Sequence, residues 1–99
     1  MQRGRRVDAN QGIIVNALRA SGARVVITSA VGSMGGNLAG FPDIVIGYAG
    51  RTILGEIKTS KGKLSPAEQT FVDTWSLSGD DYVVLRSVDD ALALINRLQ

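Results

Sequence analysis

Residues 43–58 read D-I-V-I-G-Y-A-G-R-T-I-L-G-E-I-K, and they carry the strongest strand pattern in this chain. Its two halves, 43–48 and 51–58, carry apolar residues on both alternating faces, which is typical of strands that are covered on both sides. Ala49 and Gly50 separate the halves and favour a tight turn. The stretch therefore predicts an antiparallel hairpin inside a sheet that has helices on both faces.

This hairpin brings two carboxylates together. With the turn at 49–50, Asp43 lies directly opposite Glu56, and opposed Cβ atoms on one face are about 4.5 to 5.5 Å apart. Lys58 follows Glu56 by two residues and so projects from the same face. Two carboxylates that close repel each other unless a cation lies between them. The three residues therefore form a candidate site for a divalent metal that is bound through oxygen.

Two alternatives remain open at this point. A three-residue loop with a glycine bulge would shift the pairing by one residue, because Ala49 is unfavourable at positive φ. A D…E-x-K pattern with free spacing also arises by chance, and Asp43 can simply be the first residue of a strand after Pro42. The spacing alone thus supports both a structural and a catalytic interpretation.

The rest of the chain alternates helices and strands. A capping pattern predicts a helix that begins at Asp8 and ends at Gly22, preceded by a flexible basic arm over 1–7. Strands are expected over 24–29 and 82–86, and helices over 65–76 and from Ser87 to the C-terminal end. The resulting order α-β-β-β-α-β-α predicts an α/β fold, with a mixed β-sheet flanked by helices, in a single domain over 8–99.

The composition excludes several classes of enzyme. The chain has 99 residues, no His and no Cys, so it cannot form a Ser-His-Asp triad, a Cys-His pair, a zinc finger or a disulfide. Catalysis must then use carboxylates, lysine, hydroxyls or an oxygen-bound metal. The N-terminal residues lead into no apolar stretch, so we expect a cytoplasmic protein with no membrane span.

Three motifs point to a family. G-F-P-D at 40–43, G-E-I-K at 55–58 and K-L-S-P-A-E-Q at 63–69, in this order of elements, resemble the VRR-NUC family of the PD-(D/E)xK nuclease superfamily. The likeness extends from Asp8 to about Leu94 and is greatest to the small standalone members of phage and bacterial genomes. The resemblance implies a restriction-endonuclease-like core and a metal-dependent DNA endonuclease.

The resemblance also implies roles for single residues. Asp43, Glu56 and the backbone carbonyl of Ile57 would bind Mg²⁺ or Mn²⁺, and Lys58 would orient the attacking water or stabilise charge on the phosphate. Gln69 would join the site from the helix that follows the hairpin.

Gln11 stands where the family often has a glutamate that faces the site. Its amide would reach the metal through a water molecule, or it would serve as the capping partner of Asp8, and the sequence supports both interpretations equally. A neutral amide here puts a tightly held second metal in doubt.

The expected partner is DNA. Five basic residues are candidates for phosphate contacts, since each neutralised phosphate releases counterions: Arg3, Arg5, Arg6, Lys61 and Lys63. The standalone relatives imply a homodimer that acts on branched DNA such as four-way (Holliday) junctions, with no small-molecule cofactor. A restriction-type or nicking enzyme, and an inactive DNA-binding dimer of the same fold, remain alternatives.

Two segments are candidates for the dimer surface. One is the helix that carries Phe71 and Trp75, and the other is the segment 30–41, whose glycines and lack of charge predict a mobile loop close to the metal site.

Overall fold

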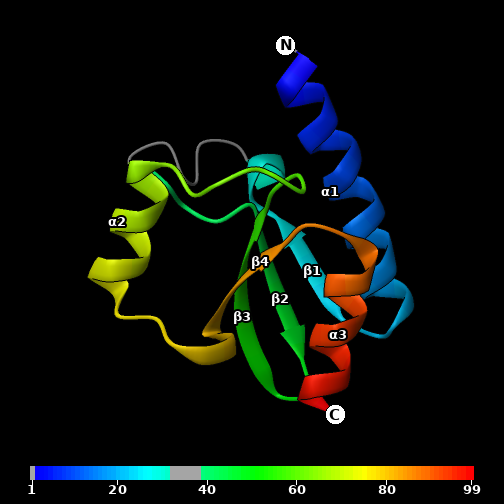
Figure 1. The fold of residues 1–99 in the computed structure, drawn as a ribbon. Coiled ribbons are helices and arrows are strands. Elements are labelled where there is room, and N and C mark those ends of the chain that lie inside the picture. Colours follow the sequence, from blue (N-terminus) through cyan, green and yellow to red (C-terminus); the bar gives the residue numbers. More distant parts are fainter. Residues whose placement is uncertain (1, 32–38) are drawn as a thin grey trace.

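The computed structural model describes residues 2–31 and 39–99. Within these ranges the chain forms three α-helices and one four-stranded sheet (Figure 1). In chain order the elements are α1 (Gln2–Ala20), β1 (Arg24–Ile27), the 3-10 helix η1 (Thr28–Val31), β2 (Ile44–Tyr48), β3 (Arg51–Ile57), α2 (Pro66–Trp75), the 3-10 helix η2 (Gly79–Asp81), β4 (Tyr82–Leu85) and α3 (Val88–Leu98). The expected α/β class with a mixed sheet is confirmed.

The hairpin of β2 and β3 has the register that a two-residue turn dictates. Ile44 pairs with Gly55, and Tyr48 pairs with Arg51. Ala49 and Gly50 have φ angles of 53° and 75°, and positive φ at both positions is what a type I′ turn requires. The one-residue shift that a longer loop would cause is therefore absent from this hairpin.

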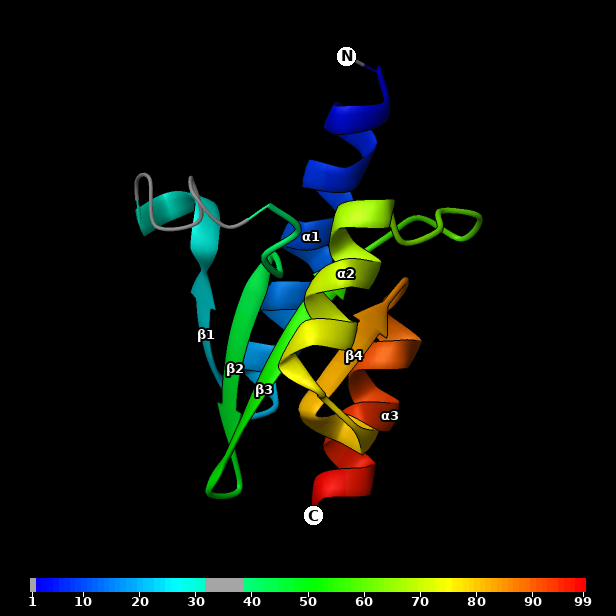
Figure 2. The same ribbon diagram turned by 90° about the vertical axis from the view of Figure 1, so that its left-hand side faces the viewer.

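The sheet has the strand order β1-β2-β3-β4, in which β4 alone runs parallel to its neighbour. α1 and α3 cover one face, and α2 lies on the opposite side (Figures 1 and 2). The core fills the space between the sheet and the α1–α3 layer. Its buried members include Ile14, Val15, Leu18, Val25, Ile44, Ile46, Ile53, Ile57, Val83, Leu85, Ala91, Leu94 and Ile95.

This core fixes which side chains face α2. Successive residues of a strand point to opposite faces, and Ile44, Ile53 and Ile57 all belong to the core. The other face of the sheet, toward α2, therefore carries Asp43 and the even-numbered residues of β3, which include Glu56. The polar residues of the hairpin are thus separated from the main core by the sheet itself.

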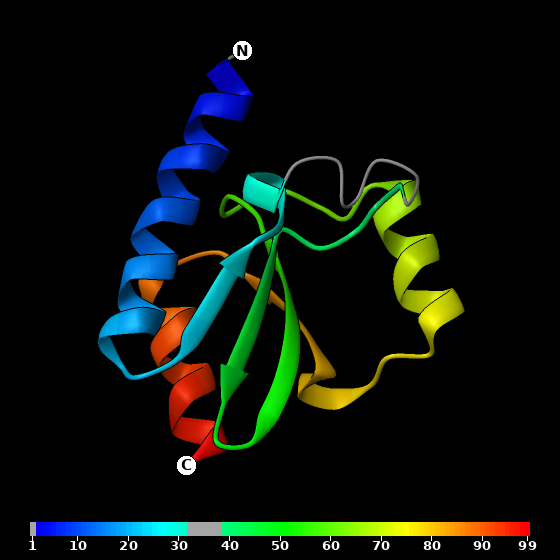
Figure 3. The ribbon, with the colours of Figure 1, turned by 180° about the vertical axis from the view of Figure 1, so that it is seen from behind.

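α1 is longer than its sequence predicts. The helix begins at Gln2, so the prediction that it begins at Asp8 is wrong, and residues 2–7 lie within α1. Glutamine and arginine have high helix propensity, which favours continuation of the helix upstream of the capping pattern. In Figure 3 these first turns extend past the end of the sheet.

The predicted mobile loop over 30–41 falls mostly on residues 32–38, which lie outside the described residues. None of the helices within the described ranges is long and apolar enough to cross a membrane.

Candidate active site

Asp43 and Glu56 meet at the open end of the β2–β3 hairpin. Ile44–Gly55 is the last pair of the ladder, and Asp43 and Glu56 are the residues that follow it in the same register. The backbone carbonyl of Asp43 accepts a hydrogen bond from Thr28 N at 2.9 Å, on the β1 side, so the backbone of Asp43 faces away from β3. Residues in such a non-hydrogen-bonded pair bring their side chains closer than those in a hydrogen-bonded pair. The structure therefore brings together the two carboxylates that the sequence pattern places opposite each other.

The Asp43 side chain accepts a hydrogen bond that a backbone carbonyl of the neighbouring strand would otherwise accept. Pro42 would be the next partner of Ile57, but proline has no N–H to donate, and the Pro42 carbonyl accepts from Thr28 Oγ1 at 2.8 Å. The Ile57 N–H instead donates to Asp43 Oδ2 at 2.8 Å. The N–H and C=O of one strand residue point to the same side. The Ile57 carbonyl therefore points to the same side as its N–H, toward the Asp43 carboxylate.

Glu56 is buried without full hydrogen bonding. Only 3 % of the residue is exposed, and its Oε1 has no hydrogen-bond partner among the described residues. Burial raises the pKa of Glu56 to about 10, and the neighbouring carboxyls of Asp43 and Glu68 contribute to the shift. Glu56 is thus protonated at neutral pH in the absence of a cation. An unpartnered buried oxygen of this kind indicates a site for a ligand, because leaving it unpaired costs free energy.

Lys58 joins this cluster to α2. The lysine is 6 % exposed, and its Nζ lies 2.7 Å from Glu68 Oε1 and 3.9 Å from Glu56 Oε2. Glu68 Oε1 also accepts a hydrogen bond from the backbone N–H of Ser65 at 2.8 Å. The structure thus adds Glu68 to the residues that the sequence singled out for the site.

The charge of Glu68 follows from these contacts. Burial raises its pKa, but the hydrogen bonds from Lys58 and from the backbone N–H of Ser65 outweigh burial and hold the pKa of Glu68 below its ordinary value. Glu68 is therefore the ionised partner of Lys58, whereas Glu56 beside it is neutral. The two glutamates have different roles because their environments differ.

Gln69 is not brought to this cluster. It is exposed, and its Nε2 donates to Asp73 Oδ1 at 3.0 Å on the outer side of α2. Successive helical residues are about 100° apart around the axis. Because Glu68 faces the site, Gln69 points away from it.

The predicted contribution of Gln11 is also changed. Gln11 is half-buried inside α1, and since the helix continues through Asp8 the two residues do not form a helix cap. Its neighbour Asn10 is the residue of α1 that contacts the strand ends. Asn10 Nδ2 donates to the carbonyl of Lys58 at 2.8 Å and to that of Arg86 at 3.1 Å.

Arg86, the residue after β4, holds the basic loop that follows β3. Arg86 Nη1 donates to the carbonyls of Thr59, at 2.8 Å, and Gly62, at 2.5 Å. Lys61 and Lys63 on this loop are both exposed, so their ammonium groups are available to solvent next to the buried Lys58. The side chains of Arg3, Arg5 and Arg6 lie outside the described part of the structure.

The donor set fits a hard divalent cation. Asp43, Glu56 and the Ile57 carbonyl supply oxygens at one end of the hairpin, and Mg²⁺ is commonly bound by one or two carboxylates together with water and phosphate oxygens. No three carboxylates among the described side chains form a complete metal site, and Glu68 is bound to Lys58. The unpartnered Oε1 of Glu56 is the observation that favours a cation here.

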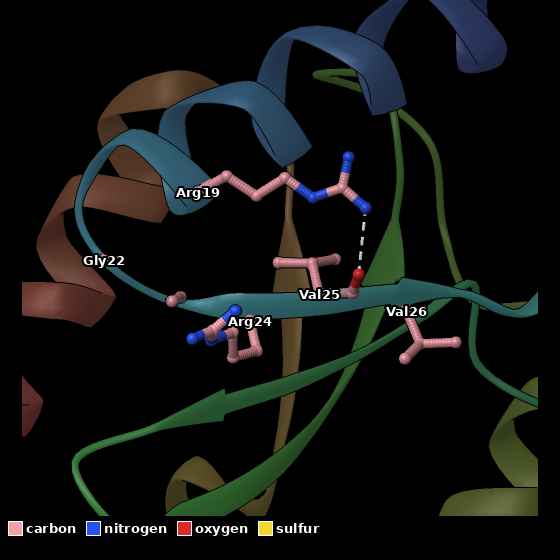
Figure 4. A pocket seen from close by; sticks show the side chains of 6 residues that line it. Arg19, Gly22, Arg24, Val25 and Val26 are labelled. Carbon is pink, nitrogen blue, oxygen red and sulfur yellow. Dashed lines mark hydrogen bonds between the residues drawn. The ribbon is translucent and has the colours of Figure 1, made fainter.

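A separate hollow of about 520 Å³ lies at the outer edge of β1. Arg19 and Arg24 line it, and Arg19 Nη2 donates to the Val25 carbonyl at 2.9 Å (Figure 4). This bond occupies an acceptor on an edge strand, which is one way in which proteins protect such edges from pairing with another chain. The hollow is lined in part by residues of β1 that precede Thr28, the residue that contacts Asp43. It shares no lining residue with the carboxylate cluster.

Comparisons of this chain with protein-family models, with curated proteins and with solved structures found no match.

Proposed function

We propose that this protein is a metal-dependent DNA endonuclease with a restriction-endonuclease-like core, of the VRR-NUC type within the PD-(D/E)xK superfamily. The observation that carries the proposal is the convergence of Asp43 and Glu56, with the buried Oε1 of Glu56 lacking a partner among the described residues. The motifs at 40–43, 55–58 and 63–69 and the order of helices and strands also support it.

In this proposal Asp43, Glu56 and the Ile57 carbonyl hold Mg²⁺ or Mn²⁺. When bound, the cation polarises the scissile phosphoryl group and offsets the negative charge that develops on it. Glu56 must lose its proton to act as an anionic ligand, because burial raises its pKa to about 10. Asp43 is oriented for its role by the hydrogen bond from Ile57 N.

Lys58 supplies a positive charge beside the reacting phosphate. Its Nζ lies 3.9 Å from Glu56 Oε2, so an ammonium group at this place stabilises charge that develops on the phosphate and orients the attacking water. Glu68 acts through Lys58, since the 2.7 Å contact fixes the position of the ammonium group. Glu68 is therefore a positioning residue in the proposed reaction.

The proposed substrate is branched DNA, such as a four-way junction, cut by a homodimer. Lys61 and Lys63 are exposed on a loop that Arg86 holds, which supports contacts to phosphates beside the cleavage site. Arg3, Arg5 and Arg6, in the first turns of α1, are proposed as further phosphate contacts. Trp75 is 50 % exposed and stacks on Phe71 with ring centroids 4.6 Å apart, an aromatic surface that a second copy of the chain would cover.

The test is a cleavage assay on labelled linear, flapped and four-way DNA, with Mg²⁺, Mn²⁺ or a chelator. We expect cleavage that requires the metal, prefers the four-way substrate and is lost in Asp43→Asn and Glu56→Gln. Asp81→Asn is the matched control, because it makes the same acid-to-amide change in an exposed ion pair with Arg51. Wild-type rates in Glu56→Gln would contradict the site, and metal-dependent cleavage of all substrates at equal rates would contradict only the junction preference.

Light scattering tests the dimer separately. We expect the wild type to scatter as a dimer, and Trp75→Ser, which removes the half-exposed ring, to shift it toward the monomer. A wild-type monomer that cuts DNA would remove the dimer from the proposal and leave the metal-dependent nuclease intact.

A further inference from the structure

Tyr82 lies on the same face of the sheet as the carboxylate cluster. It is the first residue of β4 and pairs with Leu54 of β3, while Val84 pairs with Glu56. Val83 belongs to the core beneath the sheet, so alternation points the Tyr82 ring toward the α2 side, where Glu56 also projects. A tyrosine two residues away along the neighbouring strand has the length to approach that carboxylate.

The Tyr82 hydroxyl and the Glu56 carboxyl each have a buried oxygen without a hydrogen-bond partner in the part of the chain that the structure describes. Among the described residues, two buried side-chain atoms capable of hydrogen bonding have no partner, Tyr82 OH and Glu56 Oε1. One is a phenol, which donates, and the other is a carboxyl oxygen, which accepts. Burial raises the pKa of Tyr82, so the hydroxyl keeps its proton at neutral pH and can act as a donor.

A stable protein rarely leaves two such groups unpaired on one face, because each costs free energy when it is buried without a partner. Carboxylates that hold a metal are themselves commonly hydrogen-bonded by a neighbouring residue, which fixes their orientation. Of the described side chains beside Glu56, Lys58 is bound to Glu68, and Asp43 accepts from Ile57 N. The Tyr82 hydroxyl is the neighbouring donor that has no other bond.

We propose that Tyr82 is a positioning residue of this site: its hydroxyl, which has no partner within the described ranges, donates a hydrogen bond to the Glu56 carboxylate when a divalent cation binds, and holds that carboxylate in the orientation that binds the cation. This inference rests on the proposed metal site at Asp43 and Glu56. It extends the site from β3 to β4, so that both partners of the parallel strand pair contribute to it.

The test uses the full chain and Mn²⁺ alone as the probe. Tyr82→Phe removes only the hydroxyl, and we expect its affinity for Mn²⁺, measured by calorimetry, to fall about tenfold or more. The melting temperature of the metal-free variant should equal or exceed that of the wild type, because no hydrogen bond is lost. Tyr48→Phe is the matched control: its hydroxyl accepts from Gln99 Nε2 at 3.1 Å, outside the site, and its loss should leave Mn²⁺ affinity unchanged.

Each outcome has a distinct meaning when Glu56→Gln is measured in parallel. Loss of Mn²⁺ binding in Glu56→Gln with wild-type affinity in Tyr82→Phe would overturn the role of Tyr82 and leave the metal site standing. A metal-free Tyr82→Phe protein that melts several degrees lower would show that the hydroxyl already has a structural partner, and would also overturn it. A wild type that binds no Mn²⁺, or a Glu56→Gln variant that binds it normally, would overturn the proposed metal site and this inference together.

Discussion

Lys58 Nζ lies 2.7 Å from Glu68 Oε1, and this contact ties the end of β3 to the first turn of α2. The same Oε1 atom accepts the Ser65 N–H that begins α2. One carboxylate oxygen therefore serves both as a helix cap and as the partner of a buried lysine. Removing the Glu68 side chain is therefore expected to alter the helix start and the charge balance of the site at the same time.

Replacing Glu68 by Gln separates these two functions. Glutamine at this position of a capping box still accepts from the Ser65 N–H, but it removes the charge that pairs with Lys58. We expect the free energy of unfolding to fall by about 1 to 3 kcal/mol and DNA cleavage to slow, because the ammonium group is no longer held in place. Urea unfolding and single-turnover cleavage measure the two effects, and a variant with unchanged rates would show that Glu68 has a capping role only.

Lys58→Met tests the lysine itself, with its aliphatic stem retained. We expect turnover to be lost while the affinity for Mn²⁺ is kept or rises, since a positive charge beside the carboxylates has been removed. Calorimetry and cleavage on the same preparation decide this. Retained turnover together with lost metal affinity would contradict the role assigned to Lys58.

The raised pKa of Glu56 predicts how stability depends on pH. The folded protein holds this proton up to about pH 10, whereas an unfolded chain releases it near the ordinary value of 4.5. The contribution of Glu56 is thus fully present below the unfolded pKa and is lost as pH rises toward 10, at up to about 1.4 kcal/mol per pH unit. Denaturant unfolding of metal-free protein at about pH 5, 7 and 9 should show this fall.

The control for this dependence is Glu56→Gln, in which the slope between these pH values should flatten. Because binding displaces the proton, the affinity of the wild type for Mn²⁺ should rise over the same interval. Stability that stays level or rises with pH in the wild type would contradict the protonated state of Glu56.

The hairpin and the start of α2 could be predicted because local chemistry determines both. A two-residue turn leaves one register for the flanking strands, and that register fixes Asp43 opposite Glu56. The sequence S-P-A-E at 65–68 has its hydroxyl cap, its proline and its glutamate at the positions that begin a helix, and the structure forms the complete capping box there.

Glu68 was missed as a site residue because its contact with Lys58 depends on the path of the loop between them. The capping box was the signal that could have found it. The glutamate of a capping box turns back toward the residues before the helix, and here those residues follow directly from Lys58. The start of α1 was missed because the capping pattern at Asp8 competes with the helix propensity of the residues before it. In both cases the tertiary structure decides between interpretations that are locally equivalent.

Gly40 provides a test of how α2 is positioned. Its φ is +82°, and a Cβ at this place would collide with the backbone of Ala67 and Glu68. We expect Gly40→Ala to lower the free energy of unfolding by about 2 kcal/mol or more and to slow cleavage, because Glu68 moves away from Lys58. Gly79→Ala is the control, since Gly79 also has positive φ, +57°, but an added Cβ there meets nothing within 4 Å. Equal effects of the two variants would show that the close approach of Gly40 to α2 is unimportant.

The metal site at Asp43 and Glu56 can be tested by locating bound Mn²⁺ in crystals grown with the ion, using anomalous diffraction at the manganese absorption edge. We expect an anomalous peak bounded by the carboxylates of Asp43 and Glu56 and the carbonyl of Ile57, present in the wild type and absent in Glu56→Gln. A peak elsewhere on the protein, with none between these three oxygens, would contradict it.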